Sequence, residues 1–298
     1  MTLRQINAPG FRFMPVTCNS LSMKLLFPIL MLLQACFQRT SPETVASNVS
    51  VVAADSTIEQ RFAPPTGFQR MAIKPGAFAY YLRALPLKPA VSPVLLFDGR
   101  KKSNTAAFTA VVDLPIGQKD LHQCADAVMR LRAEYFWQKR QFSQIHFNLT
   151  NGFKVDYERW RKGERVKVNG NKTEWTKTAA PSNSYATFWQ YLEFVFSYAG
   201  TLSLSKELHP VSLQDMQIGD VFIRGGSPGH AVIVVDMAVN KSGQQVFMLA
   251  QSYMPAQEIQ VLTNLEDANL SPWYTLDTTA LVIDTPEWRF RAGELMRF

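Results

Sequence analysis

The stretch that decides the fold is residues 219–237, which reads GDVFIRGGSPGHAVIVVDM. Its apolar, β-branched segments predict two strands, 220–224 and 230–237, joined by the glycine-rich loop 225–229. His230 therefore stands where a loop passes into a rigid, buried strand. Glycines let another group approach the backbone closely, and the strand holds the imidazole in place. His230 is thus a candidate functional residue, and the alternative is a strand-end histidine bonded to a neighbouring carbonyl.

A further strand is expected over residues 245–251, after a turn at 240–243. If this turn is centred between positions 241 and 242, His230 lies opposite Tyr253 and diagonal to Gln251 on one sheet face. A register slip of one residue would move Gln251 to the other face. In the first register Gln251 can accept a hydrogen bond from the imidazole and fix its tautomer. The alternative is an ordinary strand-end amide.

Cys124 is the second candidate. Asp120 and Gln123 have the spacing of a capping box, which predicts a helix with Cys124 in its first turn. Free amide groups and the helix dipole there stabilise a thiolate and lower the thiol pKa. One helical face carries Cys124, Ala127, Val128, Leu131 and Tyr135, so the thiol should point inward. An inert core cysteine is the alternative, and His122, on another side of the helix start, is a candidate site-lining residue.

The N-terminal region has the pattern of an export signal. Lys24 precedes the apolar run 25–33, and Leu33-Gln34-Ala35-Cys36 resembles the lipobox of bacterial lipoproteins. This resemblance implies that Cys36 is lipidated and begins the mature chain, that translation starts at Met23 and that residues 1–22 are over-annotated. We expect a protein exported and lipid-anchored to the bacterial cell envelope, which meets the membrane through its lipid only. An ordinary cleaved signal or a buried N-terminal helix is the alternative.

Residues 37–60 are polar and patternless, which predicts a flexible tether before one folded α+β domain over 61–298. Because Cys18 and Cys36 precede that domain, Cys124 has no disulfide partner within it. Residues 1–36 hold three basic residues and no acid, so the net charge of +7 falls to +4 without them. This mild charge suits anionic cell-wall polymer or lipid headgroups and is too diffuse to indicate nucleic acid.

The other segments complete the expected domain. We predict helices at 77–85 and 184–199, strands at 94–97 and 106–114, and a polar insertion at 146–183. Its aromatic residues either pack beneath the insertion or grip a carbohydrate or peptide; they are Tyr157, Trp160 and Trp175. No metal-ligand cluster, phosphate loop or repeat is present, so we expect no metal and no cofactor. The oligomeric state is left open.

Two resemblances follow from these motifs. A thiol at a helix start, then Gly219-Asp220-Val221, Gly229-His230-Ala231-Val232 and a polar residue on the next strand, resembles the NlpC-type and CHAP-type cysteine peptidases of the papain-like superfamily. The usual Asp-Cys-Ser/Gly motif is replaced by Gln123-Cys124-Ala125-Asp126, the gap to the histidine is longer, and glutamine takes the third position. The stretch 123–135 also looks like a bacterial family described as a domain of unknown function.

The peptidase resemblance implies a papain-like core, with a nucleophile-bearing helix packed on an antiparallel β-sheet. It also implies a cysteine hydrolase, a peptidase or amidase acting on peptidoglycan stem peptides or a related amide. In it Cys124 is the nucleophile, His230 the general base and Gln251 the orienting residue. The oxyanion and site-lining positions are Gln123, His122, Tyr253 and Gly229. A non-catalytic, lipid-anchored module that binds wall fragments or a partner protein is the alternative, and a structural envelope protein with a buried Cys124 is a third.

Overall fold

The computed structural model describes residues 56–298. The expected signal, the lipidation position Cys36 and most of the expected tether lie outside these residues. Residues 58–60, the end of the expected tether, belong instead to helix α1 (Ile58–Arg61), which is capped by Thr57 and buries Ile58 completely. The folded region therefore includes residues that the polar composition assigned to the linker.

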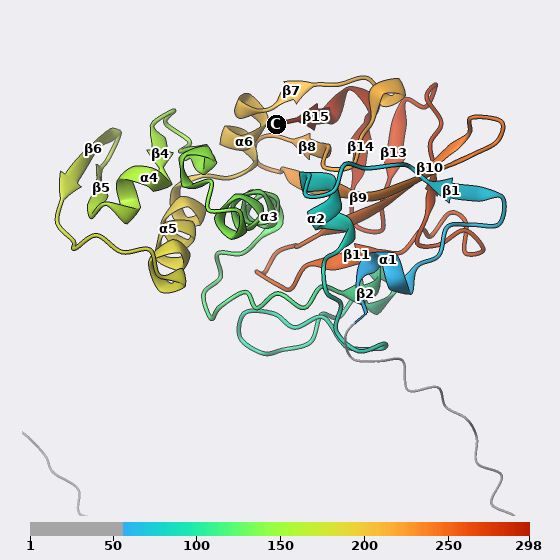
Figure 1. Cartoon of the computed structure of the whole chain (residues 1–298), viewed down its shortest axis with the longest axis horizontal. Coiled ribbons are helices and arrows are strands. Elements are labelled where there is room, and N and C mark those ends of the chain that lie inside the picture. The colour runs from blue at the N-terminus through green and yellow to red at the C-terminus, as the bar shows by residue number, and fades with distance from the viewer. Residues whose placement is uncertain (1–55) are drawn as a thin grey trace, which may run out of the picture. The chain divides into compact units, whose positions relative to one another are not determined.

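A nine-stranded antiparallel sheet forms one side of the described region (Figure 1). Its central strand β9 (His230–Asn240) is flanked by β8 (Val221–Arg224) and β10 (Gln245–Gln251). The outer strands are β11 (Gln260–Leu262), β2 (Phe108–Val111), β15 (Leu295–Arg297), β7 (His209–Pro210), β1 (Phe68–Arg70) and β12 (Tyr274–Thr275). The β-branched run 232–235 is buried, as expected of a strand covered on both faces.

The register between β9 and β10 changes along their length. Near the turn Gln245 pairs with Val239, which is one residue away from the predicted register. A β-bulge between Met248 and Leu249 then shifts the pairing, so that Ala250 faces Ile233. Extended to the end of the strands, this second register places Tyr253 opposite His230. The predicted arrangement at His230 is therefore reached through a bulge that the sequence reading did not anticipate.

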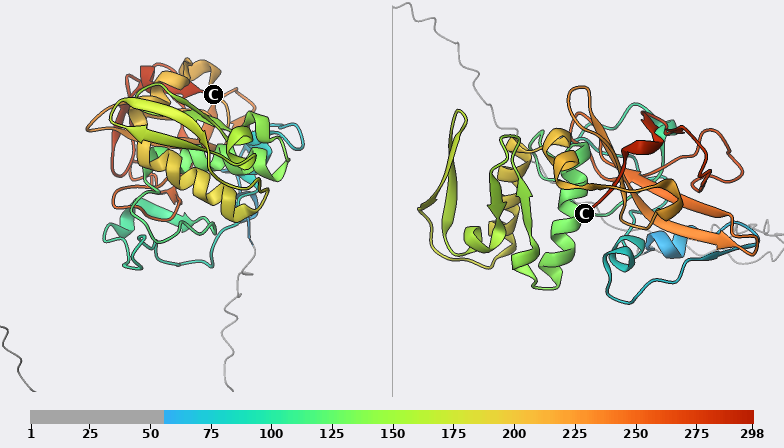
Figure 2. Two further views of the ribbon diagram at one scale, coloured as in Figure 1. Left: turned by 90° about the vertical axis from the view of Figure 1, so that its left-hand side faces the viewer. Right: turned by 90° about the horizontal axis from the view of Figure 1, so that it is seen from above.

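Helix α3 (Cys124–Gln138) lies between this sheet and the apolar helix α5 (Tyr185–Tyr198) (Figures 1 and 2). Every residue in its first half is buried, including Asp126 and Arg130. On the side of α5, Trp137 stacks on Phe188 with ring centroids 5.5 Å apart. The helix is therefore covered on several sides rather than on the single face that its apolar spacing predicted.

The polar region 146–183 contains two hairpins and a short helix. They are β3 (His146–Asn148) with β4 (Lys154–Asp156), α4 (Tyr157–Arg161), and β5 (Glu164–Asn169) with β6 (Lys172–Lys177). Tyr157 and Trp160 are buried against Tyr191 of α5. Trp175 packs beside Phe153 and under the guanidinium of Arg159. The first two aromatics are thus packing residues, which is the first of the two predicted alternatives.

The remaining elements are short. They are α2 (Phe78–Arg83), α6 (Thr201–Glu207), the hairpin of β13 (Val282–Asp284) with β14 (Arg289–Arg291), and the 3-10 turns η1 (Thr105–Ala107), η2 (Phe142–Gln144), η3 (Leu213–Asp215) and η4 (Ala292–Glu294). The strand predicted at 94–97 is wrong, because Leu95 and Leu96 form only isolated bridges. The strand predicted at 106–114 is reduced to four residues. Within residues 56–298, no helix has the length and apolarity needed to span a bilayer.

Candidate active site

Cys124 is the first residue of α3, as predicted, but a different pair caps the helix. The cap is Gln123, whose backbone N–H donates to Asp126 Oδ2 at 3.0 Å. Asp120 instead accepts a hydrogen bond from the Gln123 side chain at 3.0 Å and another from the Ala256 backbone N–H at 2.7 Å. Asp120 thus ties the entry to α3 to the segment after β10, and Asp126 closes the first turn.

Cys124 is buried, with 7% of the residue exposed. Burial raises the pKa of Cys124 to about 11, although hydrogen bonds from the backbone amides of Ala125 and Ala231 act in the opposite direction. The expected lowering of this pKa by the helix start is therefore outweighed, and the resting thiol is protonated near neutral pH. The effect of the Ala231 amide on this pKa agrees with the packing of α3 on β9, in which Ala231 directly follows His230.

His230 is 1% exposed and is held from two directions. Its Nε2 lies 2.7 Å from Gln251 Oε1. Its ring packs against Tyr253 at 4.9 Å, Trp288 at 5.4 Å and Phe290 at 5.9 Å between centroids. Burial lowers the pKa of His230 to about 4, although the hydrogen bond with Gln251 and the charge of Glu287 favour the protonated ring and act in the opposite direction. The imidazole is therefore neutral at pH 7, as a general base must be.

A buried ion pair lies behind Gln251. Gln251 Nε2 donates to Glu287 Oε2 at 2.7 Å, and Lys102 Nζ donates to the same oxygen at 2.7 Å. Asn104 Nδ2 bonds the other oxygen of Glu287 at 3.2 Å. Sequence reasoning missed this group, because Glu287 and Lys102 lie far apart along the chain, outside any motif. Only the fold brings them behind the histidine.

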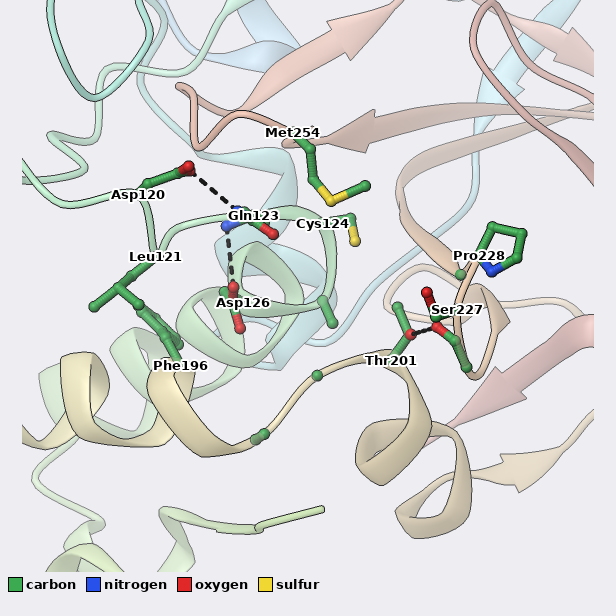
Figure 3. A pocket seen from close by; sticks show the side chains of 15 residues that line it. Asp120, Leu121, Gln123, Cys124, Asp126, Phe196, Thr201, Ser227, Pro228 and Met254 are labelled. Atoms are coloured by element: carbon green, nitrogen blue, oxygen red, sulfur yellow. Dashed lines mark hydrogen bonds between the residues drawn. The ribbon is translucent and has the colours of Figure 1, made fainter.

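A cavity of about 260 Å³ opens in front of Cys124 (Figure 3). Its walls come from the start of α3, the start of α6, the glycine loop and the chain after β10; they include Asp120, Gln123, Cys124, Asp126, Thr201, the loop 226–229 and Met254. Gly229 and Gln123, two of the predicted site residues, therefore line this cavity. None of the lining side chains is Lys, Arg or His, so the cavity suits neutral or amine-bearing groups.

The glycines of the loop are required by close packing. A Cβ on Gly229 would lie 2.4 Å from Gly226 O and 2.5 Å from Thr201 Oγ1. A Cβ on Gly225 would lie 2.2 Å from Ser205 Oγ of α6. Thr201 also donates to Gly226 O at 3.2 Å. The group that approaches the loop backbone closely is thus helix α6, and this packing fixes the loop that leads into His230.

Four predicted residues do not line the cavity: His122, His230, Gln251 and Tyr253. His122 does not line it: the ring is buried against Phe196, with Nδ1 3.2 Å from Gln257 O. Tyr253 packs on His230 rather than on the cavity. Cys124 and His230 both lie in the described part of the chain, and they form no hydrogen bond with each other. In the same range, no group of three or more His, Cys, Asp or Glu side chains is placed to hold a metal ion.

The fold and the site define a mixed α/β protein with a large antiparallel sheet, in which a helix-start cysteine lies beside the start of a strand that carries a histidine. The chain belongs to the family described as Domain of unknown function (4846), whose model matches residues 58–297. The predicted resemblance to a domain-of-unknown-function family is thus confirmed. No curated protein and no solved structure matches the chain significantly.

Proposed function

We propose that this protein is a papain-like cysteine hydrolase of the bacterial cell envelope, anchored through a lipid on Cys36. Cys124 is its nucleophile, His230 its general base and Gln251 its orienting residue. One observation carries the proposal: helix α3, which begins at Cys124, packs on strand β9, which begins with the imidazole that Gln251 holds at 2.7 Å. A cavity next to the sulfur gives a carbonyl group access to it.

The protonation states favour general-base attack rather than a preformed ion pair. The thiol and the imidazole are both neutral at pH 7, since burial raises the pKa of Cys124 to about 11 and lowers that of His230 to about 4. His230 Nδ1 takes the thiol proton while the sulfur forms a bond to the carbonyl carbon, whose π electrons move to the oxygen. In apo structures such contacts are often long and tighten when substrate binds.

The acyl-enzyme then forms and breaks down. Backbone amides at the start of α3 stabilise the oxyanion. The C–N bond breaks as the leaving amine takes the proton from His230, and a thioester on Cys124 remains. Water, deprotonated by His230, attacks this thioester; the C–S bond breaks and the thiol is restored. The products are a carboxylic acid and an amine, so the reaction is amide hydrolysis.

The proposed substrate is a peptidoglycan stem peptide or a related amide. The cavity volume of about 260 Å³ has room for a few small chemical groups beside the scissile bond, and not for a folded protein segment. Its wall contains the Asp120 carboxyl group and no lining cation, which suits a substrate with an amine group near the reacting carbonyl.

Thiol labelling together with turnover tests the proposal. We expect iodoacetamide to label Cys124 in the folded protein at pH 7.5, with a rate about 100-fold lower in His230→Ala, which lacks the base. His122→Phe is the matched control, because it removes another buried histidine outside the cavity. Purified peptidoglycan incubated with the wild type should release new amino groups, and Cys124→Ala should release none. Labelling that occurs only after unfolding, together with no released amines, would refute the hydrolase.

A non-catalytic binding module is the second candidate, favoured by the raised pKa of Cys124 and by the lack of a hydrogen bond between Cys124 and His230. Such a module would bind soluble muropeptides through the cavity without consuming them. Calorimetry would then give equal affinities for the wild type and for Cys124→Ala, with the muropeptide recovered intact. Turnover by the wild type would exclude this alternative.

A further inference from the structure

Glu287 lies in the loop between β13 and β14 and accepts hydrogen bonds from three side chains. Lys102 Nζ and Gln251 Nε2 both donate to Oε2, each at 2.7 Å, and Asn104 Nδ2 donates to Oε1 at 3.2 Å. The Lys102 and Glu287 side chains are 5% and 10% exposed, so this is a largely buried ion pair. Such a pair is costly to desolvate, and here it contacts the residue that holds His230.

The donor and acceptor capacities of these groups allow a single arrangement. A lysine ammonium can only donate and a carboxylate can only accept, so the group that Gln251 turns to Glu287 must be its NH₂. The carbonyl oxygen of Gln251 then faces His230 Nε2 at 2.7 Å. A carbonyl oxygen can only accept, so Nε2 must carry the proton of the neutral ring. The lone pair is left on Nδ1, the nitrogen that a general base would use.

We infer that Glu287 is a positioning residue that fixes, through the amide of Gln251, which nitrogen of His230 carries the proton. The inference rests on the proposed function only where it assigns a use to the Nδ1 lone pair. The geometry itself is a chain of side chains, from Lys102 through Glu287 and Gln251 to His230. Without the carboxylate, the Gln251 amide can rotate and offer its NH₂ to the imidazole, which would favour the Nδ1–H tautomer.

The same hairpin also holds the ring. Trp288 and Phe290 pack on His230 with centroids 5.4 and 5.9 Å away, and both follow Glu287 within three residues. The charged and titratable groups around the imidazole are Glu287, Tyr253, Lys102, whose ammonium lies 5.1 Å from the Tyr253 ring, and Arg224, which pairs with His230 across β8 and β9. One loop of β13–β14 therefore supplies both the orientation of the ring and the partner that sets its tautomer.

Nitrogen-15 NMR of the histidines tests this inference without any substrate. In the wild-type protein at pH 7 the His230 signals should report the Nε2–H form, with assignment by comparison with His230→Gln. The variant Lys102→Met/Glu287→Leu replaces the buried pair by apolar groups and leaves no unpaired charge. We expect its ratio of Nε2–H to Nδ1–H to fall about tenfold, the worth of one net hydrogen bond. Gln251→Leu should change the ratio similarly.

Two further variants make the result decisive. Asp284→Asn is the matched control, because it neutralises another carboxylate of the same hairpin, one that pairs with the exposed Arg289; its tautomer ratio should equal that of the wild type. Lys102→Met/Glu287→Met also lacks the acceptor for the Gln251 NH₂, keeps an unbranched side chain at position 287 and serves if the first double variant does not fold. An unchanged ratio in a folded double variant would overturn the inference. A changed ratio with an inert Cys124 would uphold it and remove the hydrolase instead.

Discussion

His230 Nε2 and Gln251 Oε1 lie 2.7 Å apart across the neighbouring strands β9 and β10, although 21 residues separate them in the chain. Both side chains are almost completely buried. In this setting the hydrogen bond is costly to leave unmade, and it also selects the protonated nitrogen of the ring.

Gln251→Leu should slow the labelling of Cys124 by about 10- to 100-fold at pH 7.5, because His230 loses the partner that fixes its tautomer as a base. The measurement is the rate of iodoacetamide incorporation, followed by mass spectrometry. Gln245→Leu makes the same chemical change at the other end of β10 and should leave the rate unaltered. Equal rates in Gln251→Leu and the wild type would show that Gln251 does not orient the base.

The protein should lose stability in acid because of its buried histidines. The pKa of His122 is lowered by burial to about 3 in the folded state, against an ordinary value of 6.5. Between these values the unfolded chain binds the extra proton, so stability is present above pH 6.5 and falls as the pH decreases. At pH 4.5 this one group should cost about 2 to 3 kcal/mol.

His122→Phe tests the origin of this loss. Chemical denaturation at pH 7 and pH 4.5 gives two unfolding free energies, and their difference should shrink by about 2 to 3 kcal/mol in the variant. His209→Gln, a change at an exposed histidine, should leave the difference as in the wild type. An identical acid loss in His122→Phe would assign it to other groups.

Asp126→Asn should remove a contribution to stability that decreases as the pH rises, which is opposite in sign to that of the buried histidines. Burial raises the pKa of Asp126 well above its ordinary value of 3.8, although a hydrogen bond from the Gln123 backbone opposes this. Above pH 3.8 the unfolded chain releases this proton before the folded protein does. Stability therefore decreases as the pH rises from 3.8 to the folded pKa. The difference in unfolding free energy between the wild type and Asp126→Asn isolates this group from the buried histidines, and it should decrease as the pH rises over that interval. A difference that does not change with pH would contradict the assignment.

Gly229→Ala should destabilise the protein by about 1 to 3 kcal/mol and displace His230, because the new methyl group has no space beside Gly226 O and Thr201 Oγ1. Thermal unfolding and Cys124 labelling would both report the change. Gly293→Ala is the control, since no heavy atom lies within 4 Å of a Cβ placed there. A stable Gly229→Ala protein with normal labelling would show that the loop adjusts freely.

Much of the local structure could be read from the sequence. The β-branched run after His230, the turn after it and the aromatic segment before Gly200 are strong local signals, and they gave β9, β10 and α5 nearly at their observed bounds. The weaker segments failed. Residues 94–97 are apolar enough for a strand but find only bridge partners, and the helix start used Asp126 rather than Asp120 in its capping box.

The amino-acid sequence by itself determined that a helix begins at Cys124 and that a buried strand begins at His230, because caps, glycines and apolar periodicity act over a few residues. Only the tertiary structure decided which groups surround them. The bulge at Met248 and Leu249 places Gln251 on the same sheet face as His230. The β13–β14 hairpin places Glu287 within hydrogen-bonding distance of Gln251, and Lys102, from a segment distant in the chain, bonds the same carboxylate. Burial, likewise a property of the whole fold, outweighs the local effect of the helix start on the pKa of Cys124.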